Sequence, residues 1–232
     1  LINNPNNPTG IVYDDAALRM IADVMEEAQQ KYGHSIYLLS DEPYREVVYD
    51  GIKMPFVTDF YKNSIIAYSF SKSMSLPGER IGYMAVNPDA DEADRICNAA
   101  GVCIRVIGCV NAPSLQQKAI IKVLDKFTDI SIYDENRKLL TEGLKKAGLE
   151  FVKPEGTFYL YVKAPNGDDV EFADRAKNHY HILISPGYAF CGPGYVRIAY
   201  CVPKDRIERA LPFFEQLAAE RSGRIGSFCS RT

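Results

Sequence analysis

The first third of the chain alternates between short apolar runs and longer mixed segments. Three runs, at residues 35–39, 64–70 and 81–86, have the length and residue types of strands buried on both faces. A segment with apolar residues at helical spacing begins after Asp14 and ends near Gly33. Short buried strands separated by helical or mixed segments predict an α/β fold with a largely parallel sheet.

The pattern changes twice further along the chain. Residues 89–148 are helical almost throughout, with an interruption at residues 108–113. Beyond Gly148, short strands and helices alternate and predict a second, smaller α+β unit. The strands are expected at residues 150–153, 157–163, 181–184 and 196–200, and the helices at residues 170–180 and 204–220. The expected division is a larger unit over residues 1–130, a connecting helix over 131–148, a small domain over 149–221 and a polar tail over 222–232.

Composition limits the kinds of partner. The 232 residues are 47% hydrophobic and 25% charged, an ordinary globular balance, and the net charge is −3. Nucleic-acid-binding proteins usually carry a basic patch, and no apolar run approaches membrane-spanning length. We therefore expect neither a nucleic-acid partner nor a membrane partner.

The cysteines and histidines do not predict a metal site. None of the six cysteines forms a Cys-x-x-Cys pair, and none of the three histidines lies near a cysteine cluster. We expect free, mostly buried thiols in a reducing cytoplasm. The chain opens on Leu1 without an initiator Met, in a pattern that resembles a strand running into a loop, so we expect a truncated start.

Two residues that directly follow buried runs carry the first chemical signal. Lys72 lies in the turn Ser71-Lys72-Ser73, and Asp41 follows the earlier run. Ligands of open α/β sheets bind outside the carboxyl ends of strands, where a lysine can attack a carbonyl. A pyridoxal cofactor also needs a carboxylate against its ring nitrogen. Taken singly, each residue could equally be an ordinary turn residue.

Four further residues extend this pattern. Tyr44 could donate a hydrogen bond to the ring oxygen of such a cofactor, and the amide of Asn7, in the loop Asn7-Pro8-Thr9-Gly10, could do the same. The guanidinium of Arg80 suits a phosphate, supported by hydroxyls such as Ser69. Asn7 alone could be a turn residue, and Arg80 alone could form a structural ion pair.

The order of these motifs resembles the class I/II aminotransferases, fold-type I enzymes that depend on pyridoxal 5'-phosphate. Within that family the sequence is most similar to the aspartate and aromatic aminotransferases, from Leu1 to about Leu217. The most specific block is residues 69–82, SFSKSMSLPGERIG, where lysine, serines and arginine fall at the family's spacing.

The resemblance implies a role for each position. Lys72 would form the Schiff base with the cofactor and then carry the proton to and from the substrate. The cofactor would be held by Asn7, Asp41, Tyr44, Ser69 and Arg80. In the small domain, Tyr195-Val196-Arg197-Ile198 matches the family's last motif, which makes Arg197 the partner of the substrate α-carboxylate.

The implied function is transfer of an amino group between an amino acid and a 2-oxo acid by a cytoplasmic homodimer. The resemblance also implies that an N-terminal segment of the large cofactor-binding domain is missing. This segment would supply a phosphate turn, a ring stacked on the cofactor and much of the dimer contact. No metal is implied, and the identity of the amino donor stays open.

Three alternatives remain at this stage. A C–S β-lyase would keep the same cofactor residues but release pyruvate and ammonia instead of requiring a 2-oxo acid. A transcriptional regulator could carry an aminotransferase-like domain behind a DNA-binding one, although the acidic composition does not support it. The chain could also be a non-catalytic piece. The upstream gene sequence would separate the last two from an enzyme.

Overall fold

The computed structural model describes residues 1–220, and the predicted tail lies outside the described residues. The chain divides into two compact units, each described here by itself. Unit 1 comprises residues 1–7, 11–130 and 155–157, and unit 2 comprises residues 8–10, 131–154 and the chain from residue 158 onward.

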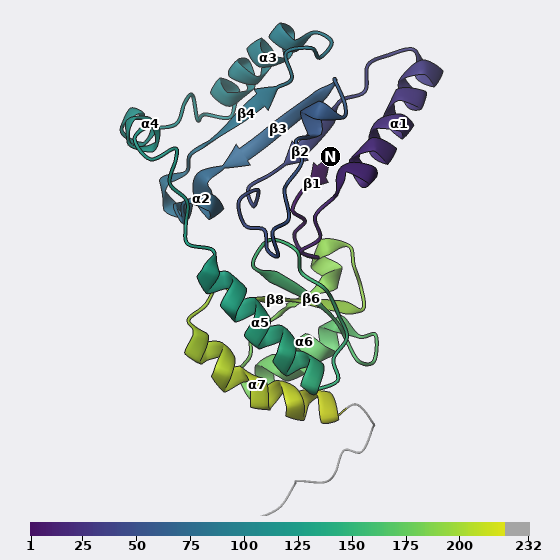
Figure 1. Cartoon of the computed structure of the whole chain (residues 1–232), viewed down its shortest axis with the longest axis vertical. Helices are drawn as coiled ribbons and strands as arrows, with labels where there is room; N and C mark the ends of the chain where they lie inside the picture. The colour runs from purple at the N-terminus through teal and green to yellow at the C-terminus, as the bar shows by residue number, and fades with distance from the viewer. Residues whose placement is uncertain (221–232) are drawn as a thin grey trace, which may run out of the picture. The chain divides into compact units, whose positions relative to one another are not determined.

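A sheet with the strand order β1-β2-β3-β4 forms the centre of unit 1 (Figure 1). Its strands are β1 (Ile2–Asn3), β2 (Leu38–Asp41), β3 (Ser64–Ser69) and β4 (Gly82–Val86). The first three run parallel and β4 runs antiparallel to β3, which confirms the predicted α/β fold with a largely parallel sheet. The expectation that the third apolar run is buried on both faces is wrong. Among the described residues β4 is the edge strand of this sheet, and its residues from Gly82 to Ala85 are exposed.

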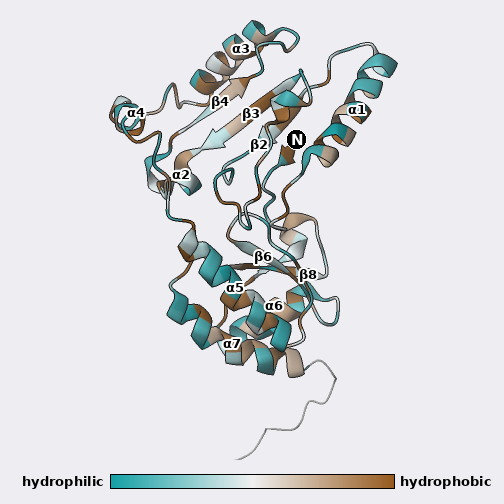
Figure 2. Ribbon diagram, viewed as in Figure 1, coloured by the Kyte–Doolittle hydropathy of each residue, from teal (hydrophilic) through white to brown (hydrophobic). Residues whose placement is uncertain are grey.

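Helix α1 (Asp15–Tyr32) follows the predicted bounds because both of its ends are capped. The Asp14 side chain accepts a hydrogen bond from Ala17 N, and Gly33, at a φ of 71°, ends the helix in the left-handed conformation. The polar and apolar stripes of α1 are visible in Figure 2. Its buried residue Ala22 belongs to a core cluster with Leu38 of β2 and Ile66 of β3, so the helix covers the sheet through its apolar face.

The remaining helices of unit 1 are short or exposed. They are α2 (Phe70–Ser73), α3 (Ala93–Val106) and α4 (Ser114–Ile121), with 3-10 turns η1 (Val57–Asp59) and η2 (Pro77–Glu79). The break between α3 and α4 confirms the predicted interruption near residues 108–113. The expectation of an otherwise continuous helical pattern is wrong at residues 122–130, which form turns and irregular chain. None of the residues of α3 is buried.

Unit 2 contains an antiparallel sheet with the order β5-β6-β8-β7 and three longer helices. Its strands are β5 (Phe151–Val152), β6 (Tyr159–Lys163), β7 (Ser185–Pro186) and β8 (Tyr195–Ala199). Its helices are α5 (Ser131–Lys146), α6 (Asp169–Tyr180) and α7 (Lys204–Ala219), with the 3-10 turn η3 (Gly187–Phe190). Fully buried Leu160, Val162, Phe214 and Leu217 form part of its interior.

One predicted strand of unit 2, at residues 181–184, is wrong. His181 caps α6 in the left-handed conformation, with a φ of 57°. The backbone N–H groups of His181 and Ile182 bond back to the last turn of α6, to the carbonyl groups of Lys177 and Ala176. Residues tied to a helix end cannot extend, so the strand begins only at Ser185.

The expectation of mostly buried thiols is also wrong for the five described cysteines, which are exposed and are not in disulfides. Cys97 and Cys103 lie on α3, whose residues are all at least partly exposed, and the other three, Cys109, Cys191 and Cys201, lie in connecting segments. Cys229 lies outside the described residues. Among residues 1–220, no helix is long and apolar enough to cross a membrane. Over the same residues, no group of His, Cys, Asp and Glu side chains is arranged to hold a metal ion.

Candidate active site

The carboxyl ends of β1, β2 and β3 bring polar side chains to one edge of the sheet. Because these strands are parallel and neighbouring, their last residues, Asn3, Asp41 and Ser69, lie along the same edge. Asn3 is the register partner of Asp41. Lys72 follows one turn after the end of β3.

Asn3 connects two of the predicted site residues. Its side-chain amide donates to the Asp41 carbonyl at 2.8 Å and to the Asp41 carboxylate at 3.1 Å. Its amide oxygen accepts from the backbone N–H of Asn7 at 2.6 Å. Burial raises the pKa of Asp41, and the Asn3 amide opposes that shift. Asn3 was not a predicted site residue, and only the register of β1 with β2 reveals its role.

Lys72 and Tyr44 are brought together. Lys72 lies in α2, a single turn whose first end is capped by the Ser69 hydroxyl, which accepts from Ser71 N at 3.2 Å. The Lys72 ammonium lies 5.8 Å from the centroid of the Tyr44 ring, and Tyr44 itself is buried. The amine therefore faces an aromatic ring from the segment that follows β2.

The predicted phosphate residues are only partly assembled. The Ser69 hydroxyl lies 2.8 Å from that of Ser71, so two hydroxyl groups stand side by side. Arg80 is exposed, adopts the left-handed conformation at a φ of 51°, and donates to the Pro77 carbonyl at 2.9 Å. Among the described residues, the structure records no hydrogen bond from Arg80 to Ser69 or Asp41.

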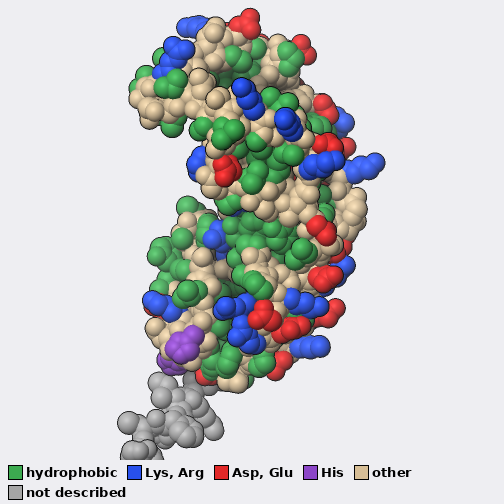
Figure 3. All heavy atoms as spheres, turned by 90° about the vertical axis from the view of Figure 1, so that its left-hand side faces the viewer, with side chains coloured by type: hydrophobic (Ala, Val, Ile, Leu, Met, Phe, Trp, Pro, Cys, Tyr) green, Lys and Arg blue, Asp and Glu red, His purple; other side chains and the backbone are tan. Residues whose placement is uncertain are grey.

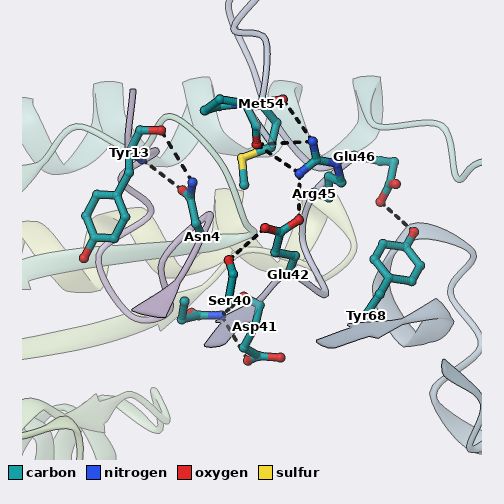
Figure 4. A network of polar contacts seen from close by, with 11 residues as sticks. Asn4, Tyr13, Ser40, Asp41, Glu42, Arg45, Glu46, Met54 and Tyr68 are labelled. Carbon is teal, nitrogen blue, oxygen red and sulfur yellow. Dashed lines mark hydrogen bonds and ion pairs between the residues drawn. The ribbon is translucent and has the colours of Figure 1, made fainter. Parts of the chain in front are cut away.

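A buried ion pair holds the segment that carries Asp41 and Tyr44 (Figure 4). Glu42, only 1% exposed, accepts from Ser40 Oγ at 2.7 Å and from Arg45 at 2.6 Å. Arg45 also donates to the carbonyl groups of Met54 and Pro55. Burial raises the pKa of Glu42, while the contacts from Ser40 and Arg45 oppose the shift. Breaking such a pair leaves a buried charge without its partner, so the segment is held tightly.

A second polar chain, also absent from the sequence prediction, runs beside Lys72. The Tyr68 hydroxyl of β3 lies 2.8 Å from the Glu46 carboxylate and 2.7 Å from the Ser73 hydroxyl. Figure 4 shows Tyr68 pointing toward Glu46. The sequence signal was weak, because Tyr68 fits the apolar pattern of a buried strand.

Arg197 lies in unit 2, on β8, between two aromatic rings. Its guanidinium carbon is 4.2 Å from the Tyr159 ring centroid and 4.4 Å from that of Phe190. Stacking on two ring faces restrains the plane of the guanidinium group and still permits in-plane hydrogen bonds.

Asp169, at the start of α6, organises the turn that supplies Phe190. Its buried carboxylate accepts from the backbone N–H groups of Tyr188 at 2.8 Å and Gly194 at 2.9 Å. Although burial by itself raises the pKa of Asp169, these backbone donors hold it below its ordinary value. The turn is tight at Gly187, where a Cβ would lie 2.2 Å from the Gly192 carbonyl oxygen.

Comparisons with known proteins agree with this arrangement of elements. The sequence model described as "Aminotransferase class I and II" matches residues 1–214. A crystal structure of an amino transferase from Eubacterium rectale superposes with a TM-score of 0.92 at 43% identity, covering 96% of this chain and 56% of that one.

Curated relatives give the same result. An aspartate aminotransferase of Thermotoga maritima is 31% identical over 226 residues, covering 95% of this chain and 56% of the relative. An aromatic-amino-acid aminotransferase of Thermococcus litoralis is 30% identical over 231 residues, covering 95% of this chain and 57% of the relative. The chain thus spans little more than half the length of these relatives.

The fold is accordingly that of the aspartate aminotransferases. The described residues include the sheet edge formed by the carboxyl ends of β1, β2 and β3. With its motifs in the family's order and the family model matching nearly its whole length, the chain belongs to the aminotransferase class I and II family.

Proposed function

We propose that this chain is part of an aminotransferase that uses pyridoxal 5'-phosphate and exchanges an amino group between an amino acid and a 2-oxo acid. The single observation that carries the proposal is the presence of Asp41 and Lys72 at the carboxyl ends of neighbouring parallel strands. That edge is where ligands of open α/β sheets bind. The homologous aminotransferases support the same reaction class.

The residues at this edge fit the cofactor. Burial raises the pKa of Asp41, so a positively charged partner such as a protonated ring nitrogen would stabilise its carboxylate. Asn3 holds that carboxylate at 3.1 Å, in the orientation set by the strand pairing. The neighbouring hydroxyls of Ser69 and Ser71 are suitable donors for phosphate oxygens.

Each remaining residue has a role in this proposal. Lys72 would supply the amine that holds the cofactor aldehyde, and Tyr44 and Asn7 would donate to the ring oxygen. Arg80 would bind the phosphate by turning its guanidinium away from the Pro77 carbonyl, since its exposed side chain is held there by a hydrogen bond at 2.9 Å. When bound, pyridoxal phosphate supplies an electron sink for the pair left by a broken bond at the substrate Cα.

Lys72 and Arg197 divide the work on the substrate. Arg197 binds the α-carboxylate through its planar fork, which orients the Cα–H bond. The Lys72 amine, when it is not bonded to the cofactor, would remove the proton from Cα as a general base and return it later as a general acid. The Tyr44 ring, 5.8 Å from the Lys72 ammonium, limits where this amine can move.

The domain assignment, the assembly and the location belong to the same proposal. Residues 1–130 would form part of the large cofactor domain, residues 131–148 the connecting helix and residues 149–221 the small domain.

Exposed apolar side chains on and after α3, among them Val106, Ile107 and Leu115, support association into a homodimer. Figure 3 shows apolar side chains interspersed with charged ones on one face of the molecule. The five described cysteines are not in disulfides, which supports a reducing, cytoplasmic location.

The test is a visible absorption spectrum of the purified protein with added pyridoxal phosphate, beside that of Lys72→Ala. We expect a band that requires Lys72 and that shifts when an amino acid is added. Restoration of the original band by a 2-oxo acid would distinguish transfer from a lyase reaction, which releases pyruvate and ammonia. An identical band in Lys72→Ala would refute the assignment.

A further inference from the structure

The turn that carries Lys72 is too short to hold its own shape. Helix α2 has four residues, and one helical turn costs more backbone entropy than its hydrogen bond returns. Its conformation must therefore come from contacts with its surroundings. At its first end the Ser69 hydroxyl caps the turn.

Ser73, next to Lys72, is the other point of attachment. It is 1% exposed, and its hydroxyl lies 2.7 Å from the Tyr68 hydroxyl. Its carbonyl oxygen accepts from Thr128 N, also at 2.7 Å. The hydroxyl and the carbonyl group of Ser73 thus both fix the turn from outside.

The direction of the hydrogen bonds follows from Glu46. A carboxylate accepts and does not donate, so the single Tyr68 proton points to Glu46 at 2.8 Å. The Tyr68 oxygen is then left to accept the proton of Ser73. Burial, opposed in part by the Ser73 contact, raises the pKa of Tyr68, and the Glu46 carboxylate adds to the rise, so the phenol keeps its proton.

Tyr68 can connect Glu46 rigidly to Ser73 because its ring cannot turn freely. It stacks on Tyr83 of β4 with 5.0 Å between ring centroids, and Phe70 meets it edge-on at 5.2 Å. Glu46, at the other end of these hydrogen bonds, lies two residues after Tyr44, whose ring faces the Lys72 amine. The hydrogen bonds therefore join the segment that carries Tyr44 to the turn that carries Lys72.

We propose that Glu46, Tyr68 and Ser73 act together as positioning residues for the Lys72 amine. Their hydrogen bonds hold α2 against the segment that follows β2. They thereby fix the position from which the Lys72 amine approaches its reaction partner. The functional meaning of this inference rests on the proposed function, because it is there that Lys72 carries the chemistry.

The test measures hydrogen exchange of the backbone amides at residues 69–76 in protein without added cofactor. Tyr68→Phe keeps the ring and removes the hydroxyl, and Ser73→Ala removes the other end of the same contact. Loss of one buried hydrogen bond in Ser73→Ala predicts exchange roughly fivefold to tenfold faster in this turn, and Tyr68→Phe, which also loses the contact to Glu46, should be at least as fast. The double variant should exchange no faster than Tyr68→Phe, because that substitution already removes the contact between Tyr68 and Ser73.

Matched controls separate positioning from general stability. Tyr83→Phe removes a hydroxyl from the ring stacked on Tyr68 and should leave the turn unchanged. Glu46→Gln keeps an acceptor oxygen and should be milder than Glu46→Ala. Equal acceleration in Tyr83→Phe, additive effects in the double variant, or a uniform rise across β1 to β3 would overturn the inference, as would an unchanged turn in Tyr68→Phe.

A second readout separates this inference from the proposed function. In Tyr68→Phe we expect pyridoxal phosphate to attach to Lys72 several-fold more slowly, with the final absorption band unchanged in position. If the cofactor attaches to Lys72 at the same rate in the wild-type protein and the variants, the positioning inference fails and the proposed function stands. If attachment of pyridoxal phosphate does not require Lys72, the proposed function fails. The hydrogen-exchange result still decides whether the hydrogen bonds of Glu46, Tyr68 and Ser73 hold the turn.

Discussion

Lys72 and Arg197 are two cationic side chains to which we assign the chemistry, and the two units hold them by different means. Lys72 lies in a four-residue turn fixed through hydrogen bonds of neighbouring hydroxyls, with the Tyr68–Ser73 contact at 2.7 Å. Arg197 lies within the regular strand β8 and is stacked between two aromatic rings at 4.2 and 4.4 Å.

The difference matches the two tasks. A lysine that must release and recover protons needs a fixed backbone and a movable amine. A turn that lies beside an aromatic ring allows both. An arginine that binds a carboxylate needs a fixed plane, because bidentate geometry fails when the fork rotates. Removing hydroxyl groups should therefore disturb Lys72, whereas removing aromatic rings, or the backbone contacts that hold them, should disturb Arg197.

The largest effect in this comparison is expected from Arg197→Ala. Losing a bidentate, charge-assisted contact should weaken binding of a carboxylate substrate roughly 100-fold, with cofactor attachment unchanged. Arg197→Lys is the control, since it keeps the charge without the fork and should recover only part of the loss. Titration of the cofactor band with an amino acid measures both, and reduced cofactor attachment in Arg197→Ala would contradict the division of roles.

Arg80→Ala should show the reverse pattern at a smaller scale. We expect cofactor affinity to fall roughly tenfold to thirtyfold, as for one hydrogen bond to a charged group, and substrate affinity of the loaded protein to stay within about twofold. Equilibrium binding of pyridoxal phosphate to Arg80→Ala and Arg197→Ala, side by side, gives the result. If both variants lose cofactor affinity equally, the assignment of phosphate to one arginine and carboxylate to the other is wrong.

The smallest expected effect on ligand binding comes from Asp169→Asn, which acts on Arg197 only through the turn carrying Phe190. An amide in place of the carboxylate keeps one acceptor oxygen and turns its NH2 group toward the other of the two donors, Tyr188 N and Gly194 N. We therefore expect a loss of about 1–3 kcal/mol of unfolding free energy. Denaturant unfolding measures this difference. Substrate affinity should fall only a few-fold.

The pH dependence of Asp169→Asn follows from the lowered pKa of Asp169. A carboxyl group with a pKa below its unfolded value of about 3.9 stabilises the fold above that pH, and the contribution is lost as pH falls through the folded-state pKa. The stability difference between wild type and Asp169→Asn should therefore be full at neutral pH and shrink below about pH 4. A difference that is constant down to pH 2 would contradict the role given to the charged carboxylate.

Much of the fold could be predicted from local sequence signals. The bounds of α1, α6 and α7 agree with the pattern because capping residues such as Asp14 and Gly33 are readable in one segment. The exposure of β4 was not readable, because its apolar run does not reveal that it has a neighbour on only one side. The strand predicted at residues 181–184 was misplaced for a related reason. His181 ends α6 in the left-handed conformation, and the sequence has no glycine there to mark the end of the helix.

The site divides in the same way. Lys72 and Asp41 could be predicted because each follows an apolar run directly, and their roles remain predictions. Asn3, Tyr68 and Asp169 could not, because their contacts join residues far apart in sequence, such as Asn3 with Asp41. A side chain that matters through a register or a backbone contact looks ordinary in its own segment.

The central claim is that the residues of this chain hold pyridoxal phosphate through Lys72. The most direct test is to add the cofactor, reduce with borohydride, digest, and find the modified peptide by mass spectrometry. We expect one dominant adduct, on Lys72, that is absent from Lys72→Ala and retained in Arg197→Ala. An adduct on another lysine, an unchanged yield in Lys72→Ala, or no adduct in the wild-type protein would contradict it.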